Sequence, residues 1–572
     1  MYPFVFSALL LAANAFGKYP VIAETNVAMK TRDEVTLRAD IYRPDAPGKF
    51  PVILERTPYD KRNWVNDGLD VAAQGYIFIM QDVRGRYASE GDWYPYKYES
   101  QDGYDTVEWA ATLPYSNGKV GMLGGSYMGM TQMLAAIAAP PHLVAIMPIV
   151  TPSNLQSYQG GAFEQLLSQA WCSMVASDTL RREVETVSQP SHWDMMRPPV
   201  NYPVLESIPP TSLAKYYFDW LAHPSYDEYW KGTSFEEHFA QIRVPALHVA
   251  GWYDIFQDGS LRDYMGIRSH GGSEAALRGQ RLVITVGGHA GFGQKVGELD
   301  FGKNSALDTL ALGLRWYDYM LKGIDNGMAR EKPVRFFVMG KNVWREEDNW
   351  PPPEARTCSY YLHSNGRANS LSGDGVLTLT RPASEPADKY LYDPGNPVPT
   401  DGGQIAGDSG RFPPGPRDQQ AVERRTDVLV YSTPPLESDL EVTGPVALDL
   451  WAKTTAADTD FTAKLVDVWP NGFAQNLTDG ILRARYRASM EKPAFMHPWQ
   501  VYELTINLWS TSNVYLAGHK LRLEVSSSNF PRFDRNTNTG ESPESATRQI
   551  TATNVVYHDR DHPSRLVVSV MP

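Results

Sequence analysis

The first 150 residues alternate between short apolar runs and helical stretches. Residues 35–41 alternate apolar and polar side chains, as a half-buried antiparallel strand does. Four further runs are largely apolar, at residues 51–54, 76–80, 120–123 and 143–147. Such runs are typical of strands that are buried on both faces of a parallel sheet. Because residues 102–113 and 130–139 have helical spacing, the pattern predicts a largely parallel sheet with helices on both faces.

The pattern changes after residue 151. Residues 152–242 are rich in aromatic, Met, Gln and Ser side chains with helical periodicity, which predicts an inserted helical cap. The alternation of strands and helices returns in residues 243–348. We therefore predict one α/β domain in two parts, residues 21–151 and 243–348, with the cap between them.

A different architecture is expected beyond the proline-rich stretch 349–354. Helix signals nearly vanish in residues 355–572, where many short strand-like runs are separated by Gly, Pro, Asn and Asp. This composition predicts a C-terminal β-sandwich or jelly roll.

Residues 1–20 resemble a signal peptide. Phe4–Leu11 is a short apolar run, and Ala13-Asn14-Ala15 offers a cleavage site of small residues. The usual Lys or Arg before the apolar run is missing. We expect a secreted or periplasmic protein; the alternative is a cytoplasmic enzyme with a disordered or docked tail.

Composition narrows the classes of function. The net charge is −13, from 53 Lys and Arg against 66 Asp and Glu, so nucleic acid is not an expected partner, because phosphate affinity needs a basic surface. No window of 18 or more apolar residues occurs, so no membrane span is expected. The two cysteines, Cys172 and Cys358, exclude a disulfide framework and a four-cysteine zinc site. They could form one bridge, but we expect two buried thiols.

The sharpest chemical signal is the sequence Gly124-Gly125-Ser126-Tyr127-Met128-Gly129. It follows an apolar strand and precedes a helix, as the nucleophile of an α/β-hydrolase does. The standard turn has Gly two residues after the serine, whereas here that Gly comes one residue later. A phosphate-binding turn is the alternative. However, the sequence has neither Gly-Lys-[Ser/Thr] nor Gly-x-Gly-x-x-Gly, the glycine motifs of nucleotide-binding sites.

A serine hydroxyl needs a base, and the base needs an acid; in this fold their order along the chain is Ser, acid, His. His289 follows the apolar run 282–286 and Gly287-Gly288, so it lies just beyond a strand end. Asp254 follows the strand 244–250 in the same way. The rival acid, Asp258, lies where the next helix begins, and His248 lies inside a strand as a core histidine would.

These residues resemble the X-prolyl dipeptidyl-peptidase and cocaine-esterase family of serine hydrolases, the CocE/NonD group, which also contains α-amino-acid ester hydrolases. The similarity extends from about residue 25 to the C-terminus. The motifs that carry it are Arg56-Thr57-Pro58-Tyr59, Gln81-Asp82-Val83-Arg84-Gly85-Arg86, the turn at 124–129, Gly251-Trp252-Tyr253-Asp254, Tyr392-Asp393-Pro394, Pro397-Val398-Pro399-Thr400 and Asn529-Phe530-Pro531-Arg532-Phe533-Asp534-Arg535-Asn536.

The resemblance implies an α/β-hydrolase core, an inserted helical cap and a C-terminal jelly roll. It also implies an oxyanion hole formed by the Tyr59 hydroxyl and the backbone N–H of Tyr127. Phe256, two residues after the acid, and the cap residues Trp171 and Phe163 are expected to line the substrate pocket.

Two positions depart from the family pattern. Relatives usually carry Gly-Pro-Trp-x-His at the base, whereas this chain has Thr285-Val286-Gly287-Gly288-His289. The amino-acid ester hydrolases hold a substrate ammonium with acidic residues, one of which follows the nucleophile closely. Residues 127–130 contain no acid here, so a free α-amino substrate is disfavoured unless Asp227 or Glu228 of the cap serves.

The predicted function is hydrolysis of a small ester or amide through an acyl-enzyme on Ser126, with no metal or organic cofactor. The first alternative is an Xaa-Pro dipeptidyl-peptidase that acts on a short peptide. The second is a catalytically silent scaffold whose jelly roll binds carbohydrate or protein; the order Ser126, Asp254, His289 argues against it. The substrate is therefore expected to be a small ester, amide or short peptide, and a homo-oligomer stays open.

Overall fold

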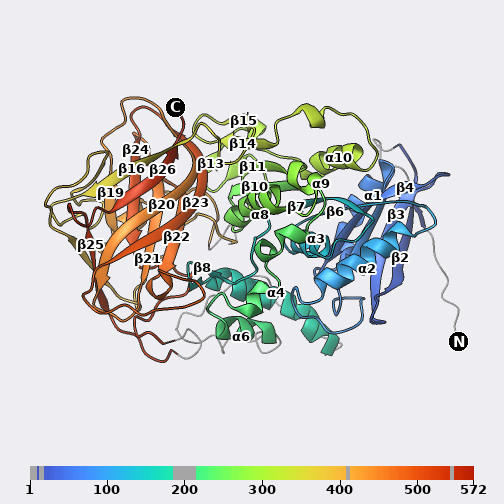
Figure 1. The fold of residues 1–572 in the computed structure, drawn as a ribbon, viewed down its shortest axis with the longest axis horizontal. Helices are drawn as coiled ribbons and strands as arrows, with labels where there is room; N and C mark the ends of the chain where they lie inside the picture. Colours follow the sequence, from blue (N-terminus) through green and yellow to red (C-terminus); the bar gives the residue numbers. More distant parts are fainter. Residues whose placement is uncertain (1–8, 12–17, 184–213, 407–411, 542–545) are drawn as a thin grey trace.

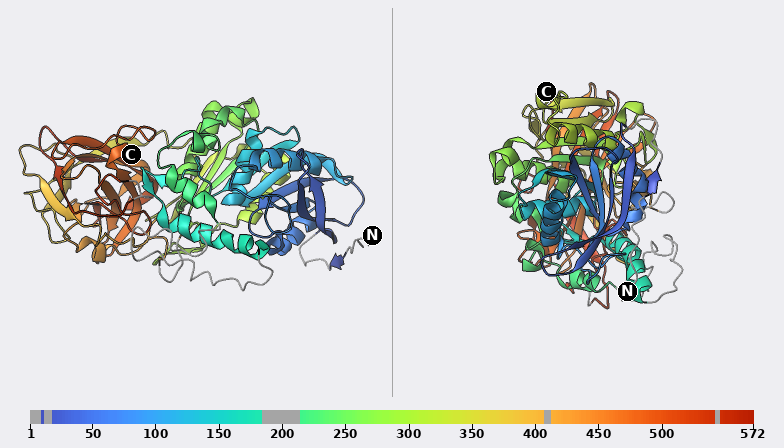
Figure 2. Two further views of the ribbon diagram at one scale, coloured as in Figure 1. Left: turned by 90° about the horizontal axis from the view of Figure 1, so that it is seen from below. Right: turned by 90° about the vertical axis from the view of Figure 1, so that its right-hand side faces the viewer.

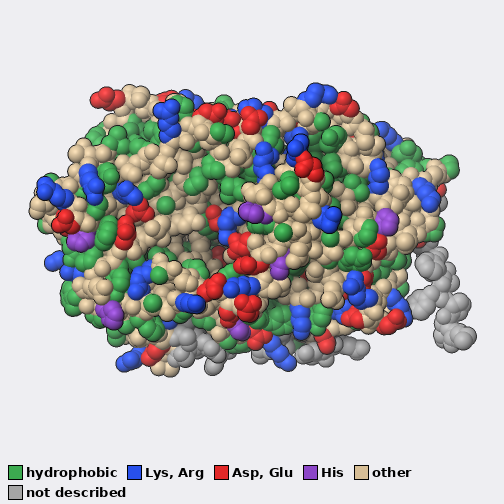
Figure 3. Space-filling model, viewed as in Figure 1, with side chains coloured by type: hydrophobic (Ala, Val, Ile, Leu, Met, Phe, Trp, Pro, Cys, Tyr) green, Lys and Arg blue, Asp and Glu red, His purple; other side chains and the backbone are tan. Residues whose placement is uncertain are grey.

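The computed structural model describes residues 9–11, 18–183, 214–406, 412–541 and 546–572. Most of the predicted leader, residues 1–20, lies outside this part of the chain. No helix within the described part is long and apolar enough to cross a membrane. The face drawn in Figure 3 mixes acidic and basic side chains and shows no continuous basic band, in keeping with the net charge of −13.

A sheet of eleven strands forms the core, in the order β1-β2-β3-β5-β4-β6-β7-β10-β11-β14-β15. The strands are β1 (Leu9–Leu11), β2 (Val21–Lys30), β3 (Thr36–Pro44), β4 (Phe50–Thr57), β5 (Ile77–Asp82), β6 (Ser116–Gly125), β7 (Leu143–Ile149), β10 (Leu247–Tyr253), β11 (Arg281–Gly288), β14 (Val334–Val338) and β15 (Val343–Glu347). The strands from β5 to β14 in this order are parallel, and β2, β3 and β15 are antiparallel to their neighbours. The edge strand β15 was not predicted.

Helices cover both faces of this sheet, as the apolar runs predict. On β4, Val52 and Leu54 face one layer while Ile53 faces the other, since successive side chains of a strand point to opposite faces. The first layer holds α2 (Glu99–Ala111), α3 (Tyr127–Ile137) and α8 (Gln257–His270), and the second holds α1 (Val65–Ala73) and α10 (Thr309–Met320). This is the α/β-hydrolase core.

The insertion between β7 and β10 forms the cap. Within the described residues it contains a short hairpin, three α-helices and two short 3-10 helices. The hairpin is formed by β8 (Tyr158–Gln159) and β9 (Ala162–Phe163), and the α-helices are α4 (Gln165–Glu183), α6 (Lys215–Ala222) and α7 (Glu228–Lys231). Aromatic side chains form its core, which explains the aromatic bias of the sequence. Figures 1 and 2 show the cap beside the core sheet and next to the C-terminal domain.

The C-terminal domain is a β-sandwich that begins at Arg356. Its strands are β16 (Arg356–His363), β17 (Gly375–Thr378), β18 (Asp388–Tyr392), β19 (Leu429–Ser432), β20 (Leu440–Thr454), β21 (Asp460–Val468), β22 (Ala474–Arg483), β23 (Tyr502–Tyr515), β24 (Lys520–Ser526), β25 (Ala552–Tyr557) and β26 (Arg565–Val570). All pairs are antiparallel except β17 with β19. One apolar core runs from β10 and β14 into these strands, so the two domains are packed together.

The hairpin β8–β9 docks on the C-terminal domain through its own backbone. The N–H of Arg483 donates to the carbonyl of Gly160 over 2.7 Å, and the N–H of Phe163 donates to the Asp534 carboxylate over 2.8 Å. Gly160 has a φ of 53°, and a Cβ atom there would lie 1.9 Å from the carbonyl oxygen of Ile481. Only glycine permits this close approach.

We predict that Gly160→Ala loosens this contact. The added methyl group must push the hairpin away from β22, at a cost of about 1–3 kcal/mol beyond the backbone strain. Hydrogen exchange of residues 158–168 should become faster. Gly323→Ala is the matched control, because Gly323 has a φ of 69° but no atom within 4 Å of its Cβ position. Equal exchange in the two variants would contradict the prediction.

Candidate active site

Ser126 lies in the tight turn between β6 and α3. Its backbone φ of 56° and ψ of −126° are unusual for a residue with a side chain. The turn is held because the Ser126 N–H donates to the carbonyl of Ile149 on β7 over 2.9 Å. The strained turn raises the hydroxyl above the carboxyl edge of the sheet, as in a nucleophile elbow.

Two glycines let β6 and α3 pass each other closely. A Cβ on Gly124 would lie 2.7 Å from the Cβ of Met128, and a Cβ on Gly129 would lie 2.3 Å from the side chain of Thr151. The glycine that comes one position later than the standard pattern is therefore the one that packs against the end of β7.

The structure brings Ser126, His289 and Asp254 together. His289 follows β11, and its Nε2 lies 2.9 Å from the Ser126 Oγ, while its Nδ1 lies 2.7 Å from the Asp254 Oδ2. Asp254 follows the neighbouring parallel strand β10, and its carboxylate is fully buried. With Asp254 accepting from the Nδ1–H, Nε2 is left to accept the serine proton.

Tyr59 lies beside this group, just after β4. The Trp171 Nε1–H donates to the Tyr59 hydroxyl oxygen over 2.9 Å. Burial raises the pKa of the Tyr59 hydroxyl to about 12, and the Trp171 hydrogen bond and the charge of Arg86 act in the opposite direction. A side-chain hydrogen bond with Ser126 also lowers this pKa. Tyr59 is therefore protonated at neutral pH and keeps one proton that it can donate.

Tyr127 is fixed by a buried network. Its hydroxyl donates to Glu99 over 2.9 Å, and the second oxygen of Glu99 accepts from Arg56 over 2.7 Å. Its ring stacks on Trp171 with centroids 6.1 Å apart and planes 15° apart. The Tyr127 backbone N–H thus belongs to a residue that cannot shift easily at the start of α3.

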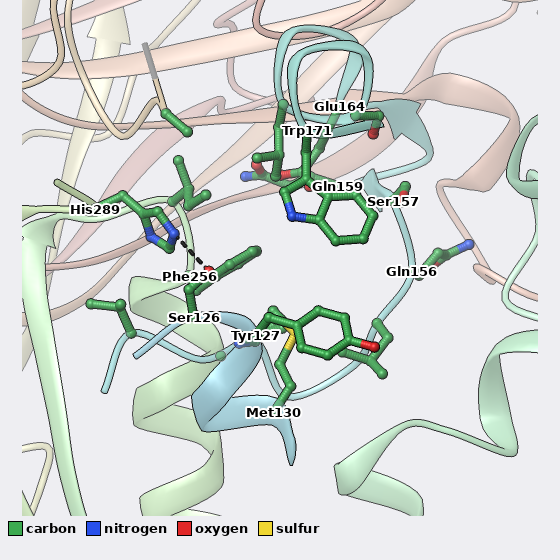
Figure 4. A pocket seen from close by; sticks show the side chains of 18 of the residues that line it. Ser126, Tyr127, Met130, Gln156, Ser157, Gln159, Glu164, Trp171, Phe256 and His289 are labelled. Carbon is green, nitrogen blue, oxygen red and sulfur yellow. Dashed lines mark hydrogen bonds between the residues drawn. The ribbon is translucent and has the colours of Figure 1, made fainter. Parts of the chain in front are cut away.

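A cavity of about 1520 Å³ opens above the serine. Its wall combines the core, through Ser126 and His289, with the cap, through Trp171, and the C-terminal domain, through Trp509. Figure 4 shows Trp171 across the cavity from Ser126 and His289, with a hydrogen bond between the latter two.

The predicted pocket residues are placed differently. Phe256 lines the cavity, and its ring packs edge-on against His289 with centroids 5.3 Å apart. Trp171 also lines it. Phe163 does not: its side chain is fully buried in the aromatic core of the cap, packed against Tyr158 and Tyr217. The prediction for Phe163 is therefore corrected, because the hairpin turns this ring inward.

Comparison with known proteins gives the family. Residues 33–291 match the X-Pro dipeptidyl-peptidase (S15 family), and residues 326–567 match the X-Pro dipeptidyl-peptidase C-terminal non-catalytic domain. The chain is 35% identical to a cocaine esterase of Rhodococcus sp. (strain MB1 Bresler) over 97% of this chain and 99% of the relative. The chain belongs to the S15 family of serine hydrolases, in the group that includes cocaine esterase.

Solved structures agree. An aminopeptidase from a marine sediment Thaumarchaeota archaeon superposes with a TM-score of 0.80 at 26% identity, covering 100% of this chain and 99% of that one. An α-amino acid ester hydrolase has the same TM-score at 24% identity, covering 100% and 99%, and supports the fold. The protein is thus a serine hydrolase that cleaves ester or amide bonds, and the silent-scaffold alternative is set aside.

The remaining candidate residues of this hydrolase have other partners. Asp258, the rival acid, lies in the first turn of α8 and pairs with Arg262 over 3.1 Å. His248 is fully buried, its Nε2 lies 2.9 Å from Gln280, and burial lowers its pKa to about 4. The two cysteines are free thiols, Cys172 buried and Cys358 half-buried. No cluster of three metal-ligating side chains occurs among the described residues.

Glu164 is a charged residue of the cavity wall that the sequence did not point to. Glu164 precedes α4 on the cap side of the cavity. No sequence motif marks Glu164, because its role depends on the lack of a charged partner around its carboxylate in the described part of the folded protein.

Proposed function

We propose that this enzyme hydrolyses small acyl esters or amides through a covalent acyl-enzyme on Ser126. The observation that carries the proposal is the continuous hydrogen-bond chain from Asp254 through His289 to Ser126, which ends in the cavity. A serine with a base 2.9 Å from its oxygen, and a base oriented by a buried carboxylate, has the parts that nucleophilic acyl transfer needs.

The steps follow from these positions. His289 Nε2 takes the Ser126 proton as Oγ attacks the carbonyl carbon, and Asp254 stabilises the imidazolium. His289 then gives that proton to the leaving group, and the acyl-enzyme forms. In the second half, His289 takes a proton from water, the hydroxide attacks the acyl carbon, and the proton returns to Ser126 as the acid is released.

The charge on the carbonyl oxygen needs donors. We assign this role to the Tyr59 hydroxyl and the Tyr127 N–H, which border the same cavity as Ser126. Because the Tyr59 oxygen already accepts from Trp171, its proton points away from the indole. An accepted hydrogen bond also polarises the hydroxyl and makes it a better donor.

The acyl pocket is proposed to lie between Phe256 and Trp171. Both present apolar ring surface to the cavity, one from the core and one from the cap. Substrate size is then set by the cap and by the C-terminal wall.

The first prediction concerns the nucleophile. Ser126→Ala should lower the turnover of p-nitrophenyl acyl esters by at least about 10³-fold, because the acyl-enzyme cannot form. A fluorophosphonate probe should label the wild type and not the variant. Ser157→Ala is the control, since Ser157 lines the cavity but lies outside the hydrogen-bond chain. Labelling of Ser126→Ala would refute the assignment.

The second prediction concerns the oxyanion donors. Tyr59→Phe should lower kcat by about 10²–10³-fold with little change in KM. Trp171→Phe keeps a ring in the stack but removes the N–H, and should lower kcat by about three- to tenfold. In the double variant, Trp171→Phe should add nothing to the loss from Tyr59→Phe. Additive losses would show that Trp171 does not act through Tyr59.

The Xaa-Pro dipeptidyl-peptidase is the second candidate, and the S15 match over residues 33–291 favours it. It requires a group that holds a peptide amine. Release of p-nitroaniline from Gly-Pro-p-nitroanilide at a kcat/KM above that of the best ester would place this candidate first. Turnover of the esters without cleavage of the anilide would support the esterase and argue against the dipeptidyl-peptidase.

A further inference from the structure

Glu164 presents a carboxylate to the cavity that holds Ser126. It also borders a small adjoining pocket with Ile405 and Arg532 of the C-terminal domain. The side chain is half-buried. Neither oxygen has a hydrogen bond or ion pair with a described residue, and the only charge that acts on its pKa is that of Arg532. Its backbone N–H donates to the carbonyl of Ser157 over 3.0 Å, so the residue itself is fixed. Figure 4 shows Glu164 on the cap wall, on the far side of Trp171 from His289.

Other charged groups of the cavity wall already have partners. Arg86 lies 3.6 Å from Asp178 and donates to two backbone carbonyls. Asp258 pairs with Arg262 over 3.1 Å. Among the described lining residues, Glu164 is therefore a carboxylate without a cation of its own.

Arg532 is the charged group that faces Glu164 from the C-terminal domain. It is held by Asp479 and donates to Gln159 over 3.2 Å. Its charge lowers the pKa of Glu164, but burial dominates and raises that pKa to about 7. The wall thus neutralises Glu164 only in part, and a carboxylate in such a site gains from a positively charged ligand.

The acids considered from the sequence do not face the cavity. Asp227 contacts the His223 ring over 2.7 Å and caps α7. Glu228 is exposed and lies 3.4 Å from Lys231. Neither lines the cavity.

We propose that Glu164 is a recognition site for a cationic group, an ammonium, on the substrate of this hydrolase. The proposal rests on the proposed function, since it assumes that substrates acylate Ser126 in the same cavity. The cap wall then selects substrates by their charge, and the residues of the α/β core catalyse the hydrolysis. Aromatic rings beside the site, Trp171 among them, add an attractive surface for an alkylammonium.

The test uses pairs of p-nitrophenyl acyl esters that differ only in a terminal trimethylammonium or tert-butyl group, over a range of chain lengths. For the cationic ester of best-fitting length, Glu164→Gln should lower kcat/KM by about tenfold, while the neutral ester changes less than twofold. Glu228→Gln, an exposed cap carboxylate, is the matched control and should change neither. Equal effects of Glu164→Gln on both esters would overturn the proposal.

The pH dependence gives a second readout. Because Glu164 ionises near pH 7, the ratio of kcat/KM for the cationic ester to that for the neutral ester should rise between pH 6 and 8 in the wild type. It should be flat in Glu164→Gln. An effect of pH on the acylation chemistry itself acts on both esters and cancels in the ratio. A ratio that rises equally in the variant would contradict the assignment.

A binding measurement separates this proposal from the catalytic one. Calorimetry of benzyltrimethylammonium with wild type and Glu164→Gln needs no turnover. At least tenfold weaker binding to the variant supports the cation site even if no ester is cleaved. Equal binding overturns the cation site, while neutral-ester turnover would still uphold the hydrolase.

Discussion

The active site depends on how the end of β10, together with the turn that follows it, is held between two domains. The Trp252 carbonyl accepts from Gln404, and the Tyr253 hydroxyl donates to the carbonyl of Asn476, both from the C-terminal domain. On the other side, a Cβ on Gly251 would lie 2.1 Å from the carbonyl oxygen of Gly287, so the end of β10 is pressed against β11. Asp254 emerges from this turn with both carboxylate oxygens bonded, to the Phe256 N–H and to His289. The base is thereby aimed at the serine by contacts outside the α/β core.

The C-terminal domain therefore shares in the site although it supplies no member of the triad. It forms part of the cavity wall through Trp509, holds the cap hairpin at Gly160, and places Arg532 near Glu164. Removing this domain would release the contacts that hold Asp254 and the cap hairpin, and would take away one wall of the cavity. The geometry of the active site therefore requires all three domains to be packed together.

Much of this could be predicted from the sequence because parallel strands end at one edge. Ser126, Asp254 and His289 each follow an apolar run, and strand order then brings them together. The cap was harder, because its aromatic side chains are alike in sequence and only packing separates Trp171, which faces the cavity, from Phe163, which does not. Glu164 could not be predicted from the sequence, because only the folded structure shows that its carboxylate lacks a paired cation among the described residues.

The departure at the base also has a structural account. Relatives usually carry a Trp two residues before the histidine, where this chain has Gly287. A Cβ on Gly287 would lie 2.4 Å from the ring of Phe292, which comes from the loop after His289 and lines the cavity. An aromatic ring thus occupies this space from a different position in the chain. His289 keeps its place because the space is filled, while the cavity wall on this side acquires a shape of its own. Specificity in this hydrolase should therefore differ from that of relatives with the usual motif, even where the triad geometry is shared.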